Sequence, residues 1–413
     1  MSKDVTIVGA GAVGIASALS LLELGHRVTV LDPDPPASGA SHGNAGVISP
    51  WTCVPQSMPG LWRSVPKWLL DPEGPLVVRW SYAARFLPWA IKFLRAGNPE
   101  KLPAIADAMN ALNRPNVDLY RHHLRGTGQE HLVANSCYVH VYRRAAAIDL
   151  NQIGWRLRAE HSVPMEVIDA PTLREMEPAL SHDYEAAVII KEQARALDPG
   201  GVGKALAEKA RKMGANFKTT RVKELIPQPG GLWQLLCDGE THTADTVVLA
   251  AGVWSARLLE PLGVRVPLEA ERGYHVVLRN PGVQINNSIM ETDRKFVASS
   301  MSAGVRMAGT AEFAGIDAEP DYRRARIFQS LARKIFPGIN ADDAEEWMGR
   351  RPSMPDSLPC IGPVPGHENL LVAFGHSHYG FGMAPATGRI IGHLVNGSSP
   401  NVNLAPYRID RFG

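Results

Sequence analysis

"VTIVGAGAVG" (residues 5–14) is the stretch that decides the fold of this chain. Val5–Val8 is a short β-branched run typical of a buried strand, and the apolar residues that follow Gly14 have helical spacing. In this G-x-G-x-x-G pattern, Gly9 permits a tight turn, Gly11 lets the backbone approach a pyrophosphate and Gly14 lets the helix pack on the strand. The pattern therefore predicts a phosphate at the positive end of the helix.

A second strand and an acidic residue complete this unit. "HRVTVLD" (residues 26–32) predicts the strand, and Asp32 stands at its end, where a ribose hydroxyl requires a partner. A glycine-rich turn alone is weak support, but strand, helix, strand and acid all fall within residues 5–32. We therefore predict a dinucleotide-binding site and reject an ordinary glycine-rich turn.

Further pieces of an α/β fold follow much later in the chain. Residues 201–219 predict a helix and a strand, "ADTVVLAAGVWSARLL" (residues 244–259) predicts a buried strand, and residues 368–388 supply a third piece. Three separated pieces of one nucleotide-binding fold suit a flavin enzyme better than a simple nicotinamide dehydrogenase. The intervening segments alternate like antiparallel strands, so we expect an α/β fold with an α+β substrate domain.

Composition excludes several other classes of protein. A chain of 413 residues that is 45% hydrophobic can bury a core larger than one ordinary domain. The net charge is +2, without long Lys/Arg blocks, so we expect no nucleic-acid partner. The four cysteines form no C-x-x-C pair, which argues against zinc ribbons, iron–sulfur clusters and disulfide frameworks. The N-terminus has no signal-like apolar region, so we expect a cytoplasmic protein.

The pair His376 and His378 suggests a metal site at first sight. A metal would need a third and a fourth ligand, and the loop around these histidines contains no acid or thiolate. We therefore expect no metal.

A resemblance to a known family rests on four segments besides the N-terminal pattern. They are "GASHGNAGVISP" (residues 39–50), "TVVLAAGVWS" (246–255), "WMGRRPSMPDSLPCIGP" (347–363) and "GHSHYGFGMAPATGRIIG" (375–392). With these segments the chain resembles the D-amino acid oxidase/glycine oxidase superfamily of FAD-dependent amine oxidoreductases, and within it the bacterial D-amino acid dehydrogenases. The segments occur in the family's order over nearly the whole chain.

The resemblance implies two interleaved domains. A Rossmann-like FAD-binding domain would comprise residues 1–50, 196–260 and 343–413, and a substrate-binding domain with an antiparallel sheet would comprise residues 51–195 and 261–342. Asn44 stands where relatives with covalently attached flavin have histidine, so the resemblance implies FAD held without a covalent bond. The implied FAD contacts are Gly9, Gly11, Val13, Gly14, Asp32, Ser41, His42, Asn44, Ala45, Gly46, Val222, Ala251, Gly252, His376, Gly380, Gly382 and Met383.

Arg351 is the strongest candidate for substrate binding. It falls in the W-x-G-x-R-P pattern, where the family holds a substrate carboxylate, and a planar guanidinium grips a carboxylate bidentately. A structural salt bridge is the alternative. The resemblance also makes Tyr274, His378 and Tyr379 candidates for the substrate pocket, each with a structural role as the alternative.

The implied reaction is oxidative deamination of D-amino acids. Hydride would pass from Cα to flavin N5, and water would hydrolyse the resulting imine. Cyclic substrates such as D-proline or 4-hydroxy-D-proline are included, and electrons would pass to a quinone or a carrier. The alternatives are a glycine/sarcosine-type amine oxidase that uses oxygen and a flavin subunit of a hetero-oligomeric dehydrogenase.

Residues 51–95 have an unusual composition. They hold Trp51, Trp62, Trp68, Trp80 and Trp89, five of the nine tryptophans, together with six basic residues. Basic and aromatic residues together are typical of a membrane interface, although no apolar run is long enough to span a bilayer. Two interpretations stay open: peripheral contact on the cytoplasmic face of the inner membrane, and a packed lid over the substrate pocket.

Overall fold

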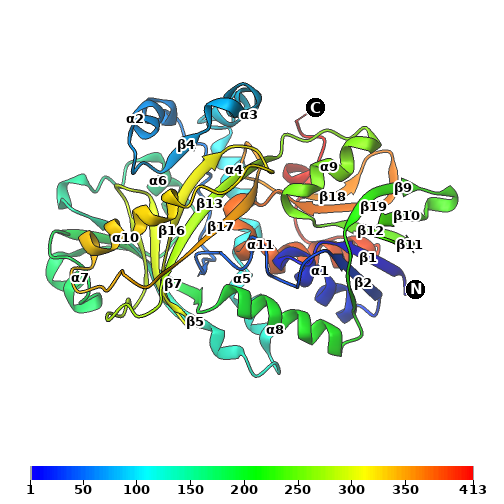
Figure 1. The fold of residues 1–413 in the computed structure, drawn as a ribbon, viewed down its shortest axis with the longest axis horizontal. Coiled ribbons are helices and arrows are strands. Elements are labelled where there is room, and N and C mark those ends of the chain that lie inside the picture. Colours follow the sequence, from blue (N-terminus) through cyan, green and yellow to red (C-terminus); the bar gives the residue numbers. More distant parts are fainter. Residues whose placement is uncertain (1, 413) are drawn as a thin grey trace.

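The computed structural model describes residues 2–412, and Figure 1 shows two sheet systems side by side. The smaller system is a six-stranded sheet in which β18 is antiparallel to β19 and the remaining neighbours are parallel. Its strands in spatial order are β18 (Cys360–Val364), β19 (His367–Phe374), β12 (Thr246–Leu249), β1 (Asp4–Val8), β2 (Arg27–Asp32) and β8 (Asn216–Thr219). The predicted strand, helix and strand at the N-terminus are confirmed.

Helices from distant parts of the chain cover this sheet, as a buried parallel sheet requires. α1 (Ala12–Glu23) and α11 (Gly380–Val395) lie on the sheet. α4 (Leu102–Asn113) and α5 (Asn116–Leu124) pack on α11, and α8 (Pro199–Lys212) packs on α1. α1 and α11 pack closely at Gly388, where an added Cβ would lie 2.5 Å from the backbone of Ala16. A small antiparallel sheet and one short helix lie beside them: β9 (Val222–Pro227), β10 (Trp233–Cys237), β11 (Thr241–Ala244) and α9 (Ser255–Leu259).

The larger system is a ten-stranded mixed sheet. Its main path runs β17 (Ala344–Ser353), β13 (Glu269–Leu278), β16 (Gly304–Phe313), β15 (Phe296–Met301), β14 (Ser288–Glu291), β5 (Val133–Tyr142), β7 (Ala186–Ala196) and β3 (Val47–Ile48). Two further strands are β4 (Leu76–Val78) on β16 and β6 (Met165–Asp169) on β7. The associated helices are α6 (Ile153–Glu160), α7 (Ala170–Met176) and α10 (Arg323–Ile335). Phe328, Leu331 and Ile335 of α10 are buried in the core beside this sheet.

The strand pairing differs from the sequence prediction in two respects. β17 pairs with β13 along its whole length, and β3 pairs with β7, so residues 344–353 and 47–48 belong to the larger sheet. In addition, β5 with β14 and β4 with β16 are parallel pairs in a sheet that we expected to be antiparallel. Long connections between these strands allow parallel pairing, which a tight hairpin does not.

Two short helices form the upper edge of the molecule in Figure 1, namely α2 (Val65–Leu70) and α3 (Ala83–Ala96). Among the described helices, none combines the length and apolar content that crossing a membrane requires. The tryptophan-rich segment contains α2, β4 and most of α3; Trp51 and Trp89 are buried, and Trp62 and Trp80 are exposed.

Candidate active site

One large cavity lies between the two sheet systems. Its volume is about 2090 Å³, above the range of about 300–1,000 Å³ that is usual for a small-molecule pocket. The carboxyl ends of β1 and β2 line one part of it, and β13, β17 and the loop before α11 line another. The cavity therefore has room for a large cofactor and a second ligand.

The glycines of the N-terminal pattern shape the first part of the cavity. Gly9 has φ +112°, and a Cβ there would lie 2.4 Å from the carbonyl oxygen of Ala250. A Cβ on Gly14 would lie 1.9 Å from the carbonyl oxygen of Gly9. Larger side chains are excluded at both positions, which leaves an open cradle at the start of α1 and confirms the predicted close packing of helix and strand.

Asp32 holds this turn from the end of β2. Its Oδ2 accepts from the backbone N of Ala10 at 2.7 Å, and its Oδ1 accepts from Asp34 N at 2.9 Å. Burial raises the pKa of Asp32, while these two N–H groups act in the opposite direction. Ser41 Oγ accepts from the backbone N of Ala12 at 2.9 Å, so the loop after β2 closes over the start of the helix.

Arg306 fixes the loop of residues 41–46 from the larger sheet. Its Nη1 donates to the carbonyl oxygens of His42 at 3.0 Å and of Asn44 at 2.7 Å, and the residue is buried. The ring nitrogen Nδ1 of His275 lies 3.2 Å from the carbonyl oxygen of Gly43, and burial lowers the pKa of His275 to about 3. Neither Arg306 nor His275 is among the residues that the sequence predicted for this site.

Four of the predicted FAD contacts do not line the cavity: Gly14, His42, Gly46 and Met383. Gly14 acts through helix packing, and Met383 is buried in the core between the sheet and its helices. A Cβ on Gly200 would lie 2.5 Å from Nδ1 of His42, so this side chain turns toward α8 instead of the cavity. The other thirteen positions line it.

An arginine and a glutamate form a charged corner deep in the cavity. Arg351 on β17 and Glu271 on β13 are directly opposite each other in the strand register, and Arg351 Nη1 forms an ion pair with Glu271 Oε1. Arg351 Nη1 also donates to Thr310 O at 3.1 Å. The glutamate side chain is 4% exposed and the arginine side chain 24% exposed, so the guanidinium faces the cavity over a carboxylate that water hardly reaches.

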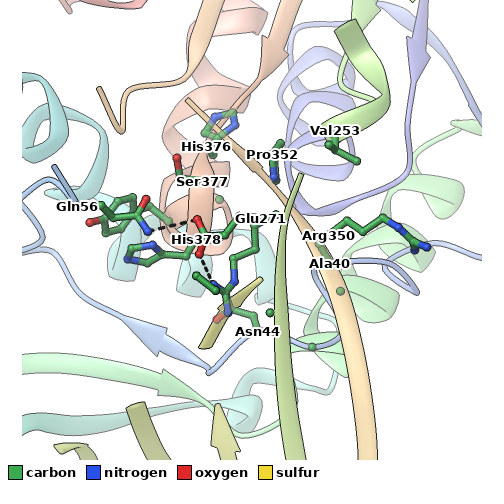
Figure 2. Close-up of a pocket in the computed structure, with 18 of the residues that line it drawn as sticks. Ala40, Asn44, Gln56, Val253, Glu271, Arg350, Pro352, His376, Ser377 and His378 are labelled. Atoms are coloured by element: carbon green, nitrogen blue, oxygen red, sulfur yellow. Dashed lines mark hydrogen bonds and ion pairs between the residues drawn. The ribbon is translucent and has the colours of Figure 1, made fainter. Parts of the chain in front are cut away.

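Glu271 is held ionised by its neighbours. Burial acts to raise its pKa, but the charge of Arg351 and a hydrogen bond from Ser353 Oγ at 2.6 Å act against burial, and the pKa lies below its usual value. Gln56 Nε2 lies 3.4 Å from Glu271 Oε2, as the close-up in Figure 2 shows. No sequence motif signalled this glutamate, because its partner Arg351 is distant along the chain.

His378 and Tyr379 follow β19 in a short turn before α11. The exposed surface of His378 faces the cavity, which this residue lines. The surrounding protein desolvates the imidazole and lowers its pKa to about 4, although the charge of Glu271 acts to raise it. The ring of Tyr379 lies 3.8 Å from the His378 ring, and its hydroxyl donates to Val54 O at 3.0 Å. The structure thus brings His378 to the charged corner (Figure 2) and commits the Tyr379 hydroxyl to the backbone.

His376 has a structural partner. Its Nε2 lies 3.0 Å from Thr387 Oγ1, and that hydroxyl donates to Met383 O, so the imidazole donates to the threonine. Burial lowers its pKa to about 3. Among residues 2–412, neither His376 nor His378 belongs to a group of metal-ligating side chains; the group that does gather is Glu23, His122 and His123, away from the cavity lining.

Tyr274 is not brought to Arg351. It lies in the core of the larger sheet with Val276, and its hydroxyl donates to Glu312 Oε2 at 2.6 Å and accepts from Asp321 N at 2.9 Å. Alternation along β13 places Gly273 on the other face, where the Arg351 guanidinium packs against it. The Tyr274 hydroxyl is thus committed to a buried hydrogen bond, while Tyr274 is also among the residues that line the cavity, and its contact with a substrate stays a prediction.

The chain is similar to known proteins over its whole length. A D-amino-acid oxidase of Bradyrhizobium diazoefficiens is 38% identical, with 99% of each chain covered. A D-amino acid dehydrogenase of Allorhizobium ampelinum is 30% identical, with 99% of this chain and 98% of the relative covered. Glycine oxidase from Geobacillus kaustophilus has a TM-score of 0.74 at 22% identity, with 99% of each chain covered, and therefore shares the fold.

A family model described as FAD dependent oxidoreductase matches residues 4–394. The residues of the site fit that cofactor, because Gly9 and Gly14 let the strand and helix pack closely while Gly9, Gly11 and Val13 line the large cavity at the start of α1. The chain belongs to the FAD-dependent oxidoreductase family.

Proposed function

We propose that this enzyme oxidises free D-amino acids to imino acids, which water hydrolyses to 2-keto acids and ammonia. The observation that carries the proposal is the guanidinium of Arg351 facing a cavity that begins at the dinucleotide cradle. Relatives named D-amino-acid oxidase and D-amino acid dehydrogenase, similar over almost the full length, support it. Cyclic substrates such as D-proline and 4-hydroxy-D-proline are part of this proposal; they yield a cyclic imine whose hydrolysis opens the ring and releases no ammonia.

Arg351 would hold the substrate carboxylate. Its contacts with Glu271, Thr310 and Gly309 use Nη1 and Nη2, and the Nη2 contact is long at 3.5 Å. Among the described residues Nε takes no acceptor in these contacts, so the edge formed by Nε and Nη2 can still bind a carboxylate side-on. Binding there fixes the Cα–H bond of the substrate relative to the cofactor, which is the main contribution of the protein.

FAD supplies a two-electron acceptor when it is bound. His378 faces the substrate region and can relay, through water, the proton that the amine releases to solvent. Its pKa of about 4 keeps the imidazole uncharged near neutral pH, so it does not retain that proton. Oxidation requires the amine lone pair, so the substrate must lose this proton before the Cα–H bond breaks. The chain thus provides a carboxylate clamp and a proton relay at one site.

The test is an anaerobic titration of the holoenzyme with D- and L-amino acids, including both enantiomers of proline. We expect D-amino acids to bleach the flavin absorbance and L-amino acids to leave it unchanged. Bleaching by L-amino acids alone, or by N-alkylglycines alone, would overturn the proposal.

We further propose that electrons pass to a quinone at a membrane surface. Seven large apolar side chains are exposed between residues 62 and 94, namely Trp62, Leu69, Leu70, Trp80, Leu87, Ile91 and Leu94. Five exposed basic residues lie among them: Arg63, Lys67, Arg85, Lys92 and Arg95. The two acidic residues of the segment, Asp71 and Glu73, pair with Arg294, which leaves a surface of apolar and basic groups that suits anionic lipid.

This surface borders the cavity. Leu70, Trp80 and Leu87 are exposed and also line the cavity. An apolar electron acceptor that leaves a bilayer would therefore enter the cavity along apolar side chains. Trp80 is 93% exposed and Leu70 83% exposed. Burying such a side chain in lipid is worth about 1.5–3 kcal/mol.

Sedimentation with phosphatidylglycerol vesicles tests this contact. The variant Leu70→Ser/Trp80→Ser should bind at least about tenfold more weakly, and Leu150→Ser, at an exposed leucine elsewhere, should bind like the unmodified enzyme. Equal binding by all three would contradict membrane contact at α2 and α3.

Oxygen is the second candidate acceptor, favoured by the name of the 38% identical relative. Oxygen consumption during D-amino acid turnover, compared with quinone reduction at the same substrate concentration, separates the two. Faster turnover with oxygen than with a soluble quinone would assign the chain to the oxidases.

A further inference from the structure

We propose that Glu271 and Arg351 together form a receptor for a zwitterion, in which Glu271 binds the α-ammonium of the substrate while Arg351 binds its carboxylate. This inference rests on the proposed function and extends it from the reaction to the choice of ligand. The two charged groups are neighbours across β13 and β17, so the strand register presents a negative and a positive group side by side.

Glu271 is fixed in position independently of Arg351. Ser353 Oγ donates to its Oε2 at 2.6 Å, and Gln56 Nε2 approaches the same oxygen at 3.4 Å. An ionised carboxylate has about four acceptor sites, and Arg351, Ser353 and Gln56 use three of them. One acceptor position therefore remains for an N–H group of a ligand.

The charge balance of the site favours a ligand that carries both signs. Arg351 and Glu271 are formally neutral together, and His378 beside them is uncharged near neutral pH. A zwitterionic amino acid adds no net charge to this desolvated corner. A simple carboxylate adds a negative charge next to Glu271, and an uncompensated buried charge is unfavourable.

In the structure the Glu271 carboxylate binds one side of the Arg351 guanidinium, and the Nε and Nη2 edge remains available to the carboxylate of a ligand. A ligand bound there would place the group on its Cα beside Glu271. Primary and secondary ammonium groups both donate to Glu271 and neutralise its charge. The hydroxyl of a 2-hydroxy acid can donate a hydrogen bond but leaves the charge of Glu271 uncompensated.

D-Alanine and propionate are matched probes, because they differ only in the amino group. We would measure the affinity for D-alanine from the concentration dependence of anaerobic flavin bleaching, and the affinity for propionate from its perturbation of the flavin spectrum at pH 7.5. Glu271→Gln should weaken D-alanine binding by about tenfold to a hundredfold, the loss of one hydrogen bond between charged groups. The same variant should tighten propionate binding, because the repelling charge is gone.

Ser353→Ala is the control variant, since it removes a hydrogen bond to Glu271 and keeps the charge. It should move both affinities in one direction, if at all. Opposite shifts in Glu271→Gln support the receptor, and a shift of both probes in the same direction, or of neither, overturns it. Failure of every D-amino acid to bleach the unmodified enzyme would instead overturn the proposed function.

Proton uptake tests the inference without a variant. A pH indicator in weakly buffered solution should report that propionate binding to the unmodified holoenzyme takes up a proton, because Glu271 or the ligand is protonated. A zwitterion, tested with L-alanine as a ligand that we expect not to be oxidised, should bind with little uptake. Equal proton uptake by the two ligands would contradict the charge balance.

Discussion

Replacing Arg351 by methionine should destabilise the protein through the glutamate that it leaves behind. Glu271 is 4% exposed, so the variant Arg351→Met strands a carboxylate in the protein interior. Removing one partner of a buried ion pair costs about 3–5 kcal/mol, and the 24% exposure of Arg351 to the cavity places the cost near about 3 kcal/mol. At about 2.1 cal/mol/K per residue, the unfolding entropy of 413 residues is about 0.87 kcal/mol/K, so Tm should fall by about 3–4 °C.

Differential scanning calorimetry at fixed FAD concentration measures this shift. The double variant Glu271→Gln/Arg351→Met should recover most of the loss, because a neutral amide needs no counter-charge. In the single variant, burial would raise the pKa of Glu271 in the folded protein above its value in the unfolded chain. The loss of unfolding free energy is therefore absent below the unfolded pKa and grows as pH rises through the folded pKa. The deficit should therefore be smaller at pH 5 than at pH 7.5. An equal deficit in the single and double variants would refute the reasoning and assign the loss to packing.

Three further substitutions test other parts of the site. Gly14→Ala should cost about 1–3 kcal/mol and lower the ratio of flavin to protein absorbance, since the new Cβ would lie 1.9 Å from Gly9 O; full FAD content would contradict the close packing. Tyr274→Phe should lower the unfolding free energy by about 1–3 kcal/mol and leave the anaerobic flavin reduction rate nearly unchanged, whereas a large loss of rate would restore its predicted substrate contact. Arg306→Met removes two donors from the loop of residues 41–46 and should weaken FAD binding by at least about tenfold, measured by the fluorescence of released flavin, with unchanged retention as the contrary result.

The sequence was most informative where the contacts are local. The N-terminal strand, turn and helix could be read because Gly9, Gly14 and Asp32 act on neighbours within one unit. Position in a motif also singled out Arg351, and the strand that carries the motif places this residue among those that line the cavity.

Other features depend on pairing between distant segments. The register of β13 against β17 brings Glu271 to Arg351 and turns Tyr274 to the other face, and a shift of one residue would exchange these roles. A pattern in one strand does not specify its register against a partner. For the same reason the sequence did not show that residues 344–353 join the larger sheet or that Arg306 reaches back to the loop after β2.

The order of strands in the six-stranded sheet sets when this enzyme can be assembled during synthesis. β1 lies between β2, which emerges early from the ribosome, and β12, and β12 in turn pairs with β19 from the last part of the chain. The helix that packs on α1 comes later still, at residues 380–395. The nascent chain must therefore carry an unfinished cradle until residues 367–395 have been made, because the sheet and the helix layer around the cradle are complete only with β19 and α11.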